Sequence, residues 1–86
     1  MFAAKDAAAL MAEAVERKKT PEANRMLVAV QRAANDGGDC ATYQTDVEFP
    51  IIRAAMEILI GLGYTATADR RPESTVYDVK IAWRHI

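Results

Sequence analysis

The chain has 86 residues, of which 51% are hydrophobic and 27% are charged, and its formal net charge at pH 7 is −1. This length predicts a single domain, 1–86, with one small core, and the near-zero charge gives no general attraction to nucleic acid or to an anionic membrane. One cysteine, Cys40, excludes an internal disulfide and fits a reducing cytoplasm, and we expect neither a membrane span nor a secretion signal.

The first part of the chain, 1–36, is predicted to be a helical hairpin. Ala3–Arg17 is dominated by alanine, the strongest helix former. Thr20-Pro21 has the pattern of an N-cap followed by proline at the first helical position, and apolar residues recur at helical spacing from there to Asn35. The short connection at Lys18–Thr20 predicts that the two helices pack antiparallel.

The second part, 40–86, is predicted to form a β-α-β-β unit. Residues of Cys40–Phe49 alternate between apolar and polar side chains, which is typical of a half-buried strand. Proline suits the first turn of a helix, so we expect a helix over Pro50–Leu62. Gly63 follows at the position where a glycine in the left-handed region ends a helix.

Two further strands, Tyr64–Ala68 and Thr75–Trp83, are predicted to form a hairpin through the polar loop Asp69–Ser74. The last strand has the most regular alternation, so we expect it at the centre of the sheet. A right-handed crossover through the helix leaves room for it between the first two strands, antiparallel to both. The predicted fold is therefore α+β, with a helical hairpin and a three-stranded sheet of order 1-3-2.

The residue types that carry chemistry do not form a catalytic constellation, and we predict a protein that is not an enzyme. His85 is the only histidine, and nothing in the sequence places an orienting carboxylate or further metal ligands beside it. Cys40 follows Asp39, whose charge does not favour a reactive thiolate. The turn Asp36–Asp39 lacks the alternating oxygen ligands of a calcium loop. We expect no catalytic residue, metal or cofactor.

Basic residues gather near the C-terminal hairpin. The candidates for contact with an anion or a partner are Arg70, Arg71, Lys80 and Arg84. Arginines of this kind can bind a phosphate. A nucleic-acid surface, however, needs a clear basic excess with aromatic platforms. We expect no nucleic-acid ligand, because Asp46 and Glu48 are predicted on the same sheet face, where they can pair with Lys80 or Arg84.

The helix Pro50–Leu62 is apolar on nearly all sides except at Arg53 and Glu57. A helix of this kind is covered on two sides. The second cover is either the N-terminal hairpin or another chain. The candidate interface residues are Phe2, Ile51, Ile58 and Ile86.

Two motifs carry a resemblance to a known group of proteins. They are Leu62-Gly63-Tyr64, at the end of the helix, and Tyr77-Asp78-Val79-Lys80-Ile81-Ala82-Trp83, in the last strand. With these motifs, about half of the chain resembles small bacteriophage proteins in which a helical segment precedes a strand, a helix and a strand that ends in tryptophan. The resemblance implies phage origin, often among genes for virion parts. The chain departs from this group in Arg84-His85-Ile86 and in its alanine-rich first helix.

The leading hypothesis is a non-enzymatic structural protein of a bacteriophage virion, assembled in the host cytoplasm. It would be a capsid, neck or tail subunit that contacts other virion proteins or its own copies. The alternative is a counter-defence or host-takeover protein that binds a host protein or a small phosphorylated ligand through the four basic residues.

Overall fold

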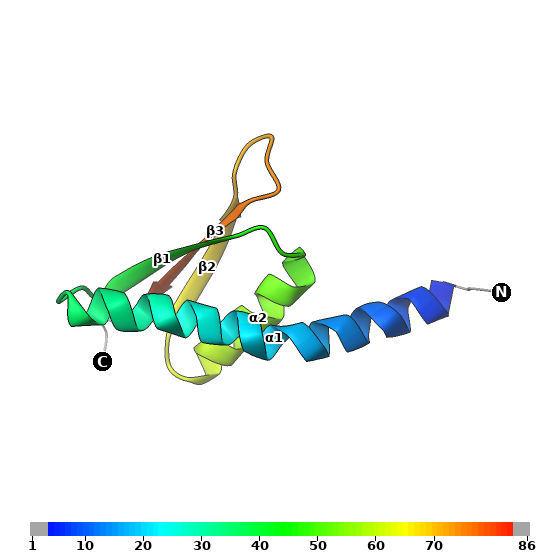
Figure 1. The fold of residues 1–86 in the computed structure, drawn as a ribbon, viewed down its shortest axis with the longest axis horizontal. Coiled ribbons are helices and arrows are strands. Elements are labelled where there is room, and N and C mark those ends of the chain that lie inside the picture. The colour runs from blue at the N-terminus through cyan, green and yellow to red at the C-terminus, as the bar shows by residue number, and fades with distance from the viewer. Residues whose placement is uncertain (1–3, 84–86) are drawn as a thin grey trace.

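The computed structural model describes residues 4–83 of the chain. The elements in chain order are α1 (Ala4–Asn35), β1 (Cys40–Thr45), α2 (Phe49–Gly61), β2 (Thr65–Arg70) and β3 (Tyr77–Ala82). Both helices lie on one face of a three-stranded sheet, and the long α1 crosses beside α2 (Figure 1). The α+β class is confirmed.

The sheet has the predicted topology. Strand β3 is central and antiparallel to both neighbours, which gives the order β1-β3-β2. Val79 lies between Tyr43 and Ala68 in this register and is fully buried on the face that the helices cover. The next residue, Lys80, points to the opposite face, which is open to solvent. Residues 4–83 therefore cover the sheet on one side only.

The predicted helical hairpin is wrong, because α1 is one continuous helix of 32 residues that passes through Pro21. The segment Lys18–Thr20, predicted to be a loop, is helical. A proline inside a helix removes one hydrogen bond and costs about 3 kcal/mol. Strong helix formers on both sides, together with the burial of Ala23 and Met26 just after the proline, outweigh that cost.

The N-terminal part of α1 projects away from the rest of the molecule (Figure 1). A helix of this length is about 48 Å long, and the longest dimension of the molecule is 54 Å. The buried residues of α1 all lie in its second half: Glu22, Ala23, Met26 and Val30. In the first half, Leu10 and Met11 are 54% and 56% exposed. We call residues 4–18 the arm.

The second half of α1 supplies the additional cover of α2. The core lies between the helices and the inner sheet face, and its fully buried large apolar side chains are Met26, Ile52, Leu59, Val79 and Ile81. The cover of α2 is incomplete, because Phe49 and Ile60 on α2 and Leu62 just after it are 42%, 52% and 60% exposed.

Helix α2 ends as the sequence predicts. Gly63 has a φ of +101° and donates its N–H to the carbonyl of Ile60 at 3.0 Å. The N–H of Tyr64 reaches back to the carbonyl of Leu59 at 3.2 Å. These two bonds form a Schellman motif, in which a left-handed glycine satisfies the last carbonyls of a helix.

The first strand is shorter than predicted. It ends at Thr45, whose Oγ1 accepts a hydrogen bond of 3.3 Å from the N–H of Val47 and turns the chain toward α2. Asp46 and Glu48 therefore lie in the β1–α2 connection and not on the outer sheet face. The expected pairing of these acids with Lys80 is not formed, since Lys80 lies between Thr42 and Thr67.

Candidate functional site

The structure does not bring the predicted basic residues into one site. The guanidinium of Arg71 donates two hydrogen bonds to the carboxylate of Asp78, at 2.9 and 3.1 Å. This pairing raises the pKa of Arg71, through the hydrogen bonds first and the opposite charge second. Arg70 is in register with Tyr77 on the inner face, whereas Lys80 lies on the outer face. Arg84 lies outside the described residues.

The predicted interface residues of α2 are largely turned inward. Ile51 is 4% exposed, and Ile58 packs partly buried against the core. Phe2 and Ile86 lie outside the described residues, as does His85. Cys40 is exposed at the start of β1. Within residues 4–83, no group of three or more metal-ligating side chains is placed to hold a metal ion. Over the same residues, neither helix is long and apolar enough to cross a membrane.

A buried carboxylate that the sequence pattern did not single out lies on α1. The side chain of Glu22 is 1% exposed. Its Oε1 accepts a hydrogen bond from Nη1 of Arg25 at 2.9 Å, and its Oε2 accepts one from the hydroxyl of Tyr43 at 3.1 Å. Burial first, and then the charge and hydrogen bond of Glu22, raise the pKa of Tyr43.

The position of Glu22 in the sequence indicates that its side chain is buried. Glu22 precedes Met26 by four positions and Val30 by eight, so a continuous helix places it on the buried stripe. A charged residue on such a stripe needs partners. The sequence alone does not show that Tyr43, on another element, supplies one of them.

A cleft of about 520 Å³ lies beside this carboxylate, between α1 and the β1–α2 connection. Its lining is Arg17, Lys18, Pro21, Glu22, Arg25, Val47, Glu48 and Ile51. A smaller and more apolar hollow of about 300 Å³ adjoins it along the arm and shares Lys18, Glu48 and Ile51 with it. Both oxygens of Glu22 are held by donors, from Arg25 and from Tyr43.

Comparisons of the chain with protein-family models, with curated proteins and with solved structures find no match. Its function is therefore inferred from the geometry of the molecule itself. The most unusual part of that geometry is the arm, an exposed helix that has apolar side chains and lies beyond the core (Figure 1).

Proposed function

We propose that the protein is a non-enzymatic structural subunit of a bacteriophage virion that acts through protein–protein contact in the capsid, neck or tail. The arm is the observation that carries this proposal. The assignment to a phage rests on the resemblance at Leu62-Gly63-Tyr64 and Tyr77–Trp83.

The arm has the amphipathic pattern of a helix that packs one side against another surface. Its small and apolar residues at helical spacing share one side: Ala4, Ala7, Ala8, Met11, Ala14 and Val15. Most charged residues take the opposite side, namely Lys5, Asp6, Glu13, Glu16 and Arg17, whereas Lys18 lies on the apolar side and lines a hollow with Met11. Toward its C-terminal end the apolar side reaches the body, where Ala14 and Val15 are half-buried and the exposed Met11 lines a hollow with Pro50 and Ile51. An isolated helix as short as the arm is marginal in water, so a partner that packs on Met11 would stabilise it.

The alternative is a counter-defence or host-takeover protein that binds a host protein or a small phosphorylated ligand, and capture of a phosphorylated ligand by the basic residues has less support. Arg71 is occupied by Asp78, and Arg70 and Lys80 lie on opposite sheet faces.

The test is mass spectrometry of purified particles of the phage that encodes the chain, with variants supplied in place of the wild type. We expect the wild-type chain in the particles and a severe loss of incorporation for Met11→Lys, because a charge on the apolar side prevents its burial. The matched control is Ala9→Lys, which adds the same charge on the polar side of the arm and should be incorporated normally. Absence of the wild-type chain from the particles would overturn the virion assignment, and equal incorporation of both variants would overturn the role of the arm.

A further inference from the structure

We infer that the outer face of α2 is a docking surface for the α2 helix of a second copy of this chain, which packs antiparallel to the first about a two-fold axis. The outer face of α2 consists of Phe49, Arg53, Met56, Glu57 and Ile60. This pairing goes beyond the proposed function, since it uses neither the arm nor any other virion protein.

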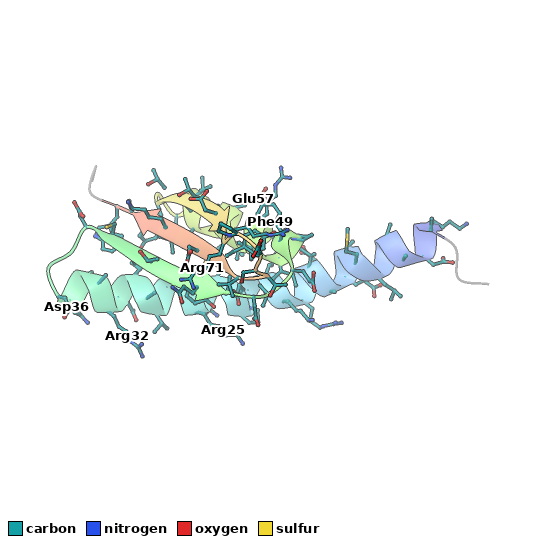
Figure 2. The ribbon with its side chains drawn as sticks, turned by 90° about the horizontal axis from the view of Figure 1, so that it is seen from above. Arg25, Arg32, Asp36, Phe49, Glu57 and Arg71 are labelled. Carbon is teal, nitrogen blue, oxygen red and sulfur yellow. The ribbon has the colours of Figure 1, made fainter. Side chains whose placement is uncertain are left out.

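The face has the spacing of a helix–helix seam. Phe49, Arg53, Met56 and Ile60 follow one another at intervals of four, three and four residues, which is the repeat of helices that pack side by side. Phe49 and Ile60, at its two ends, are 42% and 52% exposed. Two shallow hollows of about 210 and 340 Å³ flank the central Arg53 and Glu57. Phe49 and Glu57 lie on the side of the molecule away from Arg25 and Arg32 of α1 (Figure 2).

The charges on the face are complementary to themselves under a two-fold rotation. Arg53 Nε and Glu57 Oε1 are 3.6 Å apart on the same helix, and both side chains are largely exposed. An antiparallel pairing centred near Ala55 places Arg53 of each copy opposite Glu57 of the other. The dimer then has two Arg53–Glu57 pairs between the copies, and this register places no like charges opposite each other.

The sizes of the side chains are complementary in the same register. The ring of Phe49 packs against Tyr77 of its own chain, with centroids 5.3 Å apart, and its exposed part falls opposite Ile60 and Gly61 of the other copy. The space above Gly61 is open, since a Cβ placed there would have nothing within 4 Å. An aromatic ring can therefore lie over the glycine and against the isoleucine. Met56 in turn faces the aliphatic stem of Arg53 of the other copy.

A second copy fits these observations better than an unrelated protein does. An interface across a two-fold axis uses the same patch on both subunits, so the patch must be complementary to itself. The antiparallel arrangement meets this requirement, because reversing the helix direction exchanges the positions of Arg53 and Glu57. The contact between two helices of 13 residues is small, so the dimer should dissociate on dilution.

Sedimentation velocity of the full chain over a concentration series tests the pairing. As the protein concentration increases, we expect the average mass of the particles to rise from the 9.5 kDa of one chain toward twice that value. Arg53→Glu and Glu57→Arg each place like charges opposite one another. Each should raise the concentration at which half of the chains are dimeric by at least about tenfold. The double variant, with both charges exchanged, should return to wild-type behaviour because the reciprocal pairs are restored.

Two further variants define the surface. Ile60→Lys should abolish the dimer, and circular dichroism should show an unchanged fold because Ile60 is exposed. Met11→Lys, on the arm, should leave the dimer intact, which separates this result from that of the virion experiment. A wild-type chain that keeps the mass of a single chain at every concentration would overturn the inference. A dimer that the exchanged double variant does not recover would overturn it as well.

Discussion

The hydroxyl of Tyr43 on β1 donates a 3.1 Å hydrogen bond to the buried carboxylate of Glu22 on α1. These two residues are 21 positions apart, and their bond joins the long helix to an edge strand of the sheet. A carboxylate that is removed from water is tolerated only when its oxygens have donors. Arg25 supplies the second donor, at 2.9 Å. The pair therefore fixes how α1 lies across the sheet.

The first prediction concerns the contribution of this bond to stability. Tyr43→Phe removes the donor and leaves one oxygen of a buried carboxylate without its partner, so we expect the free energy of unfolding to fall by about 1–3 kcal/mol. Urea unfolding measures the change. The control is Tyr64→Phe, whose ring contacts Trp83 at a centroid distance of 6.2 Å. The control should stay within about 0.5 kcal/mol of wild type, and equal losses in the two variants would contradict the prediction.

The second prediction follows from the raised pKa of Tyr43. Its ordinary pKa is 10.0, and burial together with the Glu22 carboxylate disfavours the phenolate in the folded protein. The folded state therefore binds this proton more tightly than the unfolded state does. The resulting stability is fully present below pH 10 and is lost as the pH rises through the raised pKa.

The difference in phenolate absorbance between the wild type and Tyr43→Phe isolates this titration. We expect it to occur above the ordinary tyrosine pKa, and we expect the stability advantage of the wild type to shrink over the same alkaline range. Titration of Tyr43 at or below its ordinary pKa would mean that Glu22 and burial do not act on it as the contacts indicate.

The sheet could be predicted from sequence because its signals are local. Alternation defines the strands, and Pro50 and Gly63 mark the two ends of the helix between them. The predicted break in α1 at Lys18–Thr20 was wrong for the same reason. Thr20-Pro21 has the local chemistry of a helix start, yet whether the chain breaks there depends on what residues on both sides pack against.

The wrong prediction for α1 also left open which side of α2 is exposed. Nearly every position of this helix is apolar, so the sequence alone does not say which side is covered. The direction of α1 decides it, because α1 covers the side with Ile51 and leaves Phe49 and Ile60 exposed. The Glu22 site was missed in a similar way, since its partner Tyr43 is brought to it only by the tertiary fold.

The third prediction compares two leucines near the end of α2. Leu59 is fully buried in the core, whereas Leu62 is 60% exposed. We expect Leu59→Ala to cost about 2–5 kcal/mol through lost burial and the cavity that remains. Leu62→Ala, the same chemical change, should stay within about 0.5 kcal/mol of wild type. Thermal and urea unfolding measure both, and a cost at Leu62 comparable with that at Leu59 would place the core boundary elsewhere.

The fourth prediction tests the continuity of α1. Pro21 has no N–H to donate to the carbonyl of Arg17, and its side chain is exposed, so replacing it removes a defect and little packing. We expect Pro21→Ala to raise the free energy of unfolding by up to about 3 kcal/mol and to increase the helical signal in circular dichroism. If Pro21 instead began a second helix after a loop, the same change would remove a favourable first-turn proline and lower the stability. Pro50→Ala is the matched control, because Pro50 lies in the first turn of α2 and should give no comparable gain.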